Sequence, residues 1–156
     1  MDWSINVDIG SLDTRLGMPA IEDNVDNAAD GPLRVCIIED SRAVVEALSE
    51  QLNEIPDVSV VGTADSEASA IALLSGTEYD IAILDIQLRS GTGIGVLRAI
   101  AKAVMPVAKH INMIFSNYAE SEYRAAATRV GAQYFFDKTT DTQALLDTVA
   151  RLTAER

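Results

Sequence analysis

From Leu33 onward, short apolar runs alternate with segments whose apolar residues recur every three or four positions. Runs rich in β-branched residues predict buried strands, and the wider spacing predicts amphipathic helices. The predicted strands cover residues 33–38, 58–62, 79–84, 111–115 and 133–136, and the predicted helices cover residues 42–54, 66–75, 93–104, 119–130 and 141–154. Strands joined through helices run parallel, so this alternation predicts a doubly wound α/β domain.

Residues 1–32 differ in composition from the rest of the chain. Residues 1–30 hold seven acidic residues and one arginine, a net charge of −6 and half of the chain's total of −12. A polar stretch ending in Gly31-Pro32 is typical of a linker. Residues 3–9 alternate apolar and polar types, which is consistent either with a tail that alternates by chance or with an added edge strand or docking strand. We therefore predict an acidic N-terminal extension at 1–32 and a folded domain at 33–156.

Composition and charge exclude several classes of protein. A net charge of −12 repels a phosphate backbone and disfavours nucleic-acid binding. No apolar run is long enough to span a bilayer and the N-terminus lacks a signal peptide, so we expect no membrane association and a cytoplasmic location. Cys36 has no partner for a disulfide and is expected to be a small buried apolar residue, and the single histidine, His110, is expected to be solvated before a strand.

Polar side chains follow four of the five predicted strands within two residues. Glu39 and Asp40 follow the first strand, Asp85 the third, Ser116 the fourth and Lys138, two residues on, the fifth. In a parallel sheet these ends meet at one edge, where ligands bind in such folds. Clustered carboxylates need a cation, and oxygen ligands without histidine or thiolate favour Mg²⁺. A divalent ion beside a carboxylate nucleophile suits phosphoryl transfer.

This set of residues resembles the receiver domain of two-component response regulators. The resemblance rests on Glu39-Asp40 after a buried strand, Asp85 in Ile83–Leu88, Ser116 in Ile114–Asn117 and Lys138 at the end of Gly131–Lys138. The separations of 45, 31 and 22 residues between Asp40, Asp85, Ser116 and Lys138 fit the family, and the resemblance covers residues 33–155. It implies a flavodoxin-like five-stranded parallel sheet of order 2-1-3-4-5 with five helices.

The resemblance also implies a role for each position. Asp85 is expected to accept the phosphoryl group, and Glu39 and Asp40 to hold Mg²⁺ together with Asp85 and the backbone carbonyl of Gln87. Ser116 is expected to donate a hydrogen bond to a phosphoryl oxygen, and Lys138 to pair with Asp85 or with the phosphoryl group. Phe135 occupies the family's aromatic switch position, although a plain core aromatic is an equally good interpretation.

The chain departs from the family pattern in the loops. Arg89 and Thr139 stand where the family usually has proline, the second of these typically with a cis bond, so the peptide before Thr139 is expected to be either trans or strained. The segment Gly91-Thr-Gly-Ile-Gly95 lacks the third glycine of a dinucleotide-binding loop and follows the wrong strand. Gly93 instead matches the glycine that the family carries after its phosphoacceptor.

The expected function is that of a phosphoacceptor signalling protein, with only self-catalysed phosphotransfer and autodephosphorylation. Only Arg156 follows the segment that the resemblance covers, which favours a stand-alone receiver. The expected partners are a sensor histidine kinase, a histidine phosphotransfer protein, or a second copy through the surface of the fourth helix, fifth strand and fifth helix. The alternatives are a receiver-fold binding module regulated without phosphorylation and, ranked last because Gln87 replaces a required second aspartate, a phosphohydrolase.

Overall fold

Five parallel strands form the centre of the fold. In this computed structural model, which describes residues 31–103 and 109–156, the strands run in the order β2-β1-β3-β4-β5. Their bounds are β1 Leu33–Ile38, β2 Val58–Ala64, β3 Ile81–Leu84, β4 Ile111–Ser116 and β5 Tyr134–Asp137. The sheet order expected from the resemblance is therefore confirmed. The predicted N-terminal extension, apart from Gly31 and Pro32, lies outside the described residues.

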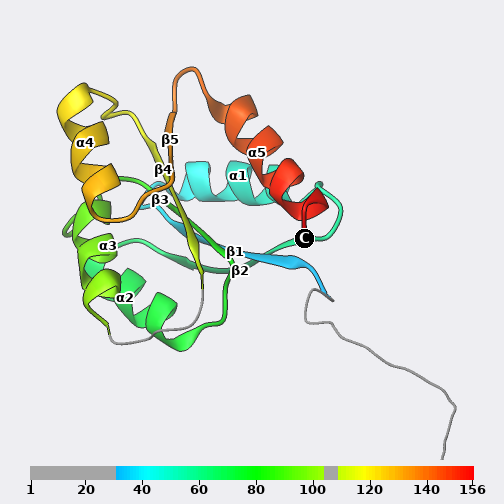
Figure 1. Ribbon diagram of the computed structural model, residues 1–156, viewed down its shortest axis with the longest axis horizontal. Helices are drawn as coiled ribbons and strands as arrows, with labels where there is room; N and C mark the ends of the chain where they lie inside the picture. The colour runs from blue at the N-terminus through cyan, green and yellow to red at the C-terminus, as the bar shows by residue number, and fades with distance from the viewer. Residues whose placement is uncertain (1–30, 104–108) are drawn as a thin grey trace, which may run out of the picture. The chain divides into compact units, whose positions relative to one another are not determined.

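Helices alternate with the strands and cover both faces of the sheet. They are α1 Arg42–Asn53, α2 Glu67–Gly76, α3 Gly93–Lys102, α4 Ser121–Arg129 and α5 Thr142–Ala154. Figure 1 shows α1 and α5 on one side of the sheet and α2, α3 and α4 on the other. Within residues 31–103 and 109–156, no helix has the length and apolar character needed to cross a bilayer.

Successive residues of each central strand point to opposite faces of the sheet and pack into two different hydrophobic cores. Val35, Ile37 and Ile83 pack with α1 and α5, whereas Cys36 and Leu84 pack with α2, α3 and α4. Side chains in a strand alternate between faces, so a strand covered on both sides is apolar at nearly every position. Cys36 is fully buried, which confirms the expectation from sequence, and burial raises the pKa of its thiol to about 11.

The predicted element bounds differ from the observed ones by at most two residues at either end, and those of β1 agree at both ends. Strand β2 continues to Ala64 because it pairs with β1 along its whole length, with a shift of register after Val60 that leaves Val61 unpaired and 39% exposed. Strand β3 begins at Ile81, and the ring of Tyr79, two residues before it, stacks on His110 with the ring centroids 4.0 Å apart. The expectation that His110 is solvated was wrong, because this stack leaves it half-buried.

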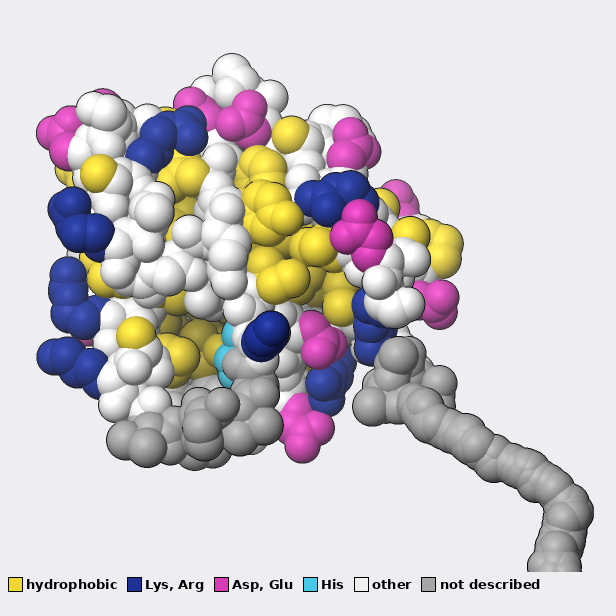
Figure 2. All heavy atoms as spheres, viewed as in Figure 1, with side chains coloured by type: hydrophobic (Ala, Val, Ile, Leu, Met, Phe, Trp, Pro, Cys, Tyr) yellow, Lys and Arg dark blue, Asp and Glu magenta, His cyan; other side chains and the backbone are white. Residues whose placement is uncertain are grey.

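Strand β5 forms an edge of the sheet between α4 and α5. Figure 2 shows hydrophobic side chains at the surface in the middle of this face of the molecule, with charged groups around them. The rings of Tyr134 and Phe136 stack with their centroids 5.9 Å apart, and Arg151 of α5 donates a hydrogen bond to the Tyr134 hydroxyl at 3.1 Å. The edge is therefore partly covered by its own side chains and by Arg151.

Helix α4 ends with Gly131 as its C′ residue. The amide of Gly131 donates to the Thr128 carbonyl at 3.1 Å and that of Ala132 to the Ala127 carbonyl at 3.0 Å, the two bonds of a Schellman motif. Gly131 adopts a φ of +101°, which L-residues with a side chain rarely adopt. This turn sets where β5 begins, and hence where Lys138 lies.

We expect Gly131→Ala to lower the free energy of unfolding by about 1–2 kcal/mol, the usual penalty for a side chain in the left-handed region. No atom lies within 4 Å of a Cβ built at this position, so the effect comes from the backbone alone. Gly76→Ala is the matched control, because it has equal space at the end of α2 without the positive φ, and it is expected to be neutral or slightly stabilising. Urea denaturation tests both, and equal midpoints for the two variants would contradict the prediction.

Candidate functional site

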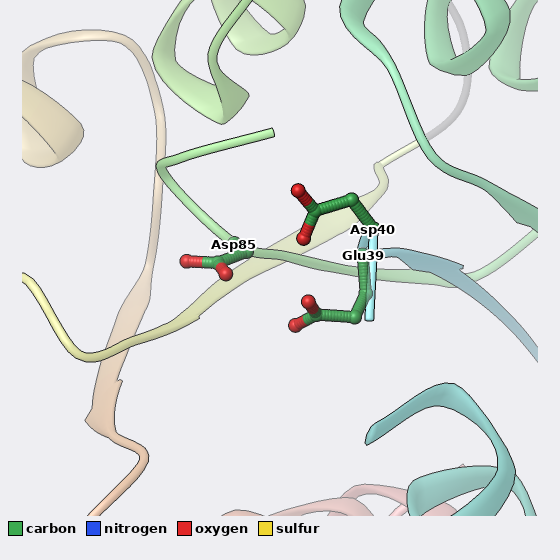
Figure 3. Close-up of side chains that lie close together, drawn as sticks. All are labelled: Glu39, Asp40 and Asp85. Atoms are coloured by element: carbon green, nitrogen blue, oxygen red, sulfur yellow. The ribbon is translucent and has the colours of Figure 1, made fainter. Parts of the chain in front are cut away.

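Three carboxylates lie together at the ends of β1 and β3. Glu39 and Asp40 follow β1 and Asp85 follows β3, and the amide of Asp85 donates to the Ile38 carbonyl at 2.9 Å. Figure 3 shows the three side chains extending toward the same side of the strand ends. One oxygen from each carboxylate lies within 4.8 Å of the others. Glu39 and Asp85 are 4% and 8% exposed, whereas Asp40 is exposed to solvent.

Lys138 joins two of these carboxylates. Its ammonium nitrogen lies 2.7 Å from Glu39 Oε1 and 2.7 Å from Asp85 Oδ2. The remaining oxygens of the two carboxylates accept from backbone amides, Glu39 Oε2 from Ser41 at 3.0 Å and Asp85 Oδ1 from Ile86 at 2.7 Å. Every oxygen of the two buried carboxylates therefore has a donor, as burial of charged groups requires.

The electrostatics of this cluster follow from burial and from these contacts. Loss of hydration raises the pKa of Glu39, because its hydrogen bonds with Lys138 and Ser41 compensate only partly. Burial lowers the pKa of Lys138, but the hydrogen bonds to Asp85 and Glu39 outweigh it and leave that pKa above its usual value. Lys138 therefore remains an ammonium group at neutral pH.

The donor set suits a divalent cation with a preference for oxygen. Three carboxylates against one ammonium leave an excess of negative charge in a small space, and no described histidine or thiol lies among them. Such a site fits Mg²⁺ better than zinc. Glu39, Asp40 and Asp85 would hold the ion.

Gln87 belongs to the loop that leaves Asp85. Its side chain is exposed, and its backbone forms an antiparallel bridge with Thr92. The loop closes where the Gly93 amide donates to the Ile86 carbonyl at 2.9 Å. A Cβ at Gly93 would lie 2.1 Å from the backbone oxygen of Asp85, so only glycine allows the start of α3 to approach this closely.

Ser116 and Phe135 lie on the two strands beyond β3. Ser116 is the fully buried last residue of β4, and its hydroxyl oxygen accepts from the Tyr118 amide at 3.1 Å. Phe135 is half-buried in β5 beside Ile114. The guanidinium of Arg124 lies 4.5 Å from the centre of the Phe135 ring, and its Nε donates to the Ala119 carbonyl at 2.9 Å. Sequence analysis missed this contact, because no spacing rule connects α4 with β5.

The turn after Lys138 forms without proline. No peptide bond is cis among the residues that the structure describes, so the Lys138–Thr139 bond is trans. The amide and hydroxyl of Thr139 both donate to Asp137 Oδ1, at 2.8 and 2.6 Å. These bonds lower the pKa of Asp137 and keep it a carboxylate. Side-chain hydrogen bonds thus shape the turn that presents Lys138.

Comparisons with known proteins agree on one family. A family model described as the response regulator receiver domain matches residues 35–150. A protein-glutamate methylesterase/protein-glutamine glutaminase of Myxococcus xanthus is 30% identical over 109 residues, covering 70% of this chain and 31% of that protein. The transcriptional activator DevR/DosR of Mycobacterium tuberculosis is 30% identical over 106 residues, covering 68% and 48%. The chain spans less than half the length of both relatives.

Solved structures show the same fold. The receiver domain of the putative response regulator NarL of Mycobacterium tuberculosis has a TM-score of 0.70 and 25% identity, with 81% of this chain and 99% of that chain covered. The response regulator domain of Thermotoga maritima CheB has a TM-score of 0.69 and 22% identity, with 79% and 97% covered. The five-stranded sheet of this chain is thus the arrangement found in receiver domains.

The raised pKa of Glu39 predicts a pH dependence of stability. The folded protein binds this proton more tightly than the unfolded chain, in which the group titrates near 4.5. Its contribution is therefore complete below pH 4.5 and is lost as the pH rises through the folded-state pKa. In metal-free buffer, we expect wild type to gain thermal stability relative to Glu39→Gln as the pH falls from 7 to 4.

The measurement is the difference in Tm between wild type and Glu39→Gln across this pH range. Glu46→Gln, which changes an exposed carboxylate of α1, is the control and should leave the difference from wild type nearly constant. If the Tm difference between wild type and Glu39→Gln does not change with pH, or if wild type instead gains stability over the variant as the pH rises, the fold does not raise the pKa of Glu39.

Proposed function

The chain belongs to the response regulator receiver domain family, and on that premise we propose that Asp85 accepts a phosphoryl group beside a bound Mg²⁺ ion. The observation that carries the proposal is the ammonium of Lys138 held 2.7 Å from both Glu39 and Asp85. A carboxylate with a fixed cation beside it is suited to receive an anionic group, because the cation can pair either with the carboxylate or with the incoming group.

The proposed reaction is a displacement at phosphorus. An oxygen of Asp85 attacks the phosphorus of a phosphohistidine or of a small phosphodonor, a new P–O bond forms, and the bond to the donor's leaving group breaks with its electron pair. Bound Mg²⁺ would neutralise charge on the transferring group. Lys138 pairs with the phosphoryl oxygens, and Ser116 donates a hydrogen bond to one of them. Hydrolysis of the same aspartyl phosphate returns the chain to its starting state.

The proposed output is a changed surface around α4, β5 and α5. Phosphorylation adds a charge of about −2 and strong acceptor oxygens. Ser116 and Lys138 are drawn toward this group, and Phe135 moves with the loop that precedes α4. Half-buried side chains of this surface, among them Tyr134 and Phe135 of β5, then serve as the contact for a partner or for a second copy of the chain.

An apolar groove beside the site offers a docking surface for the phosphodonor protein. Receiver domains interact with histidine kinases or phosphotransfer proteins, and this groove of about 360 Å³ lies between α1 and the start of α5. It is lined by Ala43, Ala47, Leu48, Phe115, Thr142 and Lys138. Because Lys138 belongs both to the groove and to the carboxylate cluster, a helix seated on α1 brings its phosphohistidine to Asp85.

We expect wild type to gain one phosphoryl group with acetyl phosphate and Mg²⁺, and Asp85→Asn to gain none, because an amide is not a nucleophile for this reaction. Mass spectrometry of the intact protein, with and without Mg²⁺, measures the gain. Asp147→Asn, an exposed aspartate of α5, is the matched control and should behave as wild type. A wild-type mass that stays unchanged would instead favour a receiver-fold binding module regulated without phosphorylation.

The docking groove has its own test. Ala47→Glu places a charge on the exposed surface of α1, within the proposed docking groove. We expect this variant to slow phosphotransfer from a histidine kinase or phosphotransfer domain by at least about tenfold. A tenfold change corresponds to about 1.4 kcal/mol, which charge repulsion or the desolvation of a charge at an interface can supply. Phosphorylation by acetyl phosphate should not change. Ala101→Glu adds the same charge to exposed α3 and serves as control. Equal rates for the two variants with the protein donor would exclude α1 as the docking surface.

A further inference from the structure

The loop after Asp85 is held by a residue at the start of helix α2. Glu67, the first residue of α2, accepts a hydrogen bond on Oε1 from the Thr92 amide at 3.0 Å. Its own amide donates to the Ser90 carbonyl at 2.8 Å. Thr92 is the N-cap of α3, so the Glu67 carboxylate lies at the positive end of that helix, where negative charge is stabilising. Glu67 thus contacts the loop through both its backbone and its side chain.

Two glycines of the Gly91–Gly95 segment make room for Glu67. A Cβ at Gly91 would lie 2.4 Å from the Cβ of Glu67, and a Cβ at Gly95 would lie 2.4 Å from its Oε1. Real side chains do not approach so closely, so any other residue at either position would displace Glu67. The third glycine, Gly93, is needed for its approach to Asp85. The spacing that suggests a dinucleotide loop is therefore explained by contacts within the fold.

A third contact ties the same two segments together. Arg89 of the loop pairs with Asp65 at 2.8 Å, two residues before Glu67. Both side chains are more than half exposed, so this pair contributes less than the amide bonds to Glu67. Residues 65–67 therefore hold the loop at residues 89, 90 and 92.

We propose that Glu67 is a positioning residue that fixes Gln87, so that the Gln87 carbonyl can serve as a ligand of the divalent ion. Gln87 is bridged to Thr92, and Thr92 is held by Glu67. Without the Glu67 carboxylate, the Thr92 amide loses its hydrogen-bond acceptor. The segment that pairs with Gln87 in the β-bridge is then no longer held in place. This inference rests on the proposed function, because it assigns Glu67 a task at the proposed Mg²⁺ site.

The test measures Mg²⁺ affinity by isothermal titration calorimetry in the absence of phosphodonor. Glu67→Ala should weaken binding about tenfold, as loss of a group that orients a metal ligand typically does. Glu67→Gln keeps an oxygen acceptor for the Thr92 amide and should bind close to wild type. Glu122→Ala removes the same charge from the first turn of α4, away from this loop, and is the matched control.

A second variant moves Glu67 without removing it. Gly95→Ala should weaken Mg²⁺ binding because its methyl group displaces the Glu67 carboxylate, although alanine is the better helix former. In metal-free buffer, the amides of Thr92 and Gly93 should exchange with solvent faster in Glu67→Ala than in Glu122→Ala. This readout needs neither metal nor phosphoryl transfer.

The outcomes separate the inference from the proposed function. Wild type that binds no Mg²⁺ overturns the proposed metal site and this inference with it. Wild-type binding that Glu67→Ala leaves unchanged, or that Glu122→Ala weakens equally, overturns the inference alone. Equal amide exchange in the two variants has the same consequence, since Glu67 would then not hold the loop.

Discussion

The site depends on one ammonium group between two buried carboxylates. Glu39 and Asp85 are almost fully covered, and Lys138 is the residue that pairs with both. A buried charge left without its partner typically costs about 3–5 kcal/mol, so the three groups act as one unit. Their positions are fixed by three strand ends, which makes the order of the sheet a requirement for the charge balance. The turn at Gly131 and the turn after Lys138 serve the same requirement at the fifth strand.

The same charge balance explains why the cluster is suited to change. One ammonium neutralises only part of the charge of three carboxylates, and Asp40 is exposed on the open side of the cluster. A divalent ion or an altered Asp85 would shift which groups Lys138 contacts, since both of its partners lie at 2.7 Å. In the proposed function, a change of charge at this edge would therefore change the contacts of Lys138.

Sequence alone predicted the elements and the polar groups at the strand ends, because hydrophobic periodicity and parallel topology determine both. It placed Glu39, Asp40, Asp85 and Lys138 at one edge, and the structure brings these four together. It could not find contacts between elements distant in the chain, such as Arg124 with Phe135 or Glu67 with Thr92. It also assigned His110 to solvent, because the stack with Tyr79 depends on two strands meeting.

Contacts of the loop after β4 connect the carboxylate edge with the surface beside β5. The Ser116 hydroxyl accepts a hydrogen bond from the Tyr118 amide, and the carbonyl of the next residue, Ala119, accepts one from Arg124 Nε. Arg124 in turn covers the Phe135 ring. In the proposed function, a Ser116 hydroxyl that turned toward a phosphoryl group would alter the first bond, and the loop would carry Arg124 with it. Phe135 would then respond without a hydroxyl of its own, because the contact that changes is the one between its ring and Arg124.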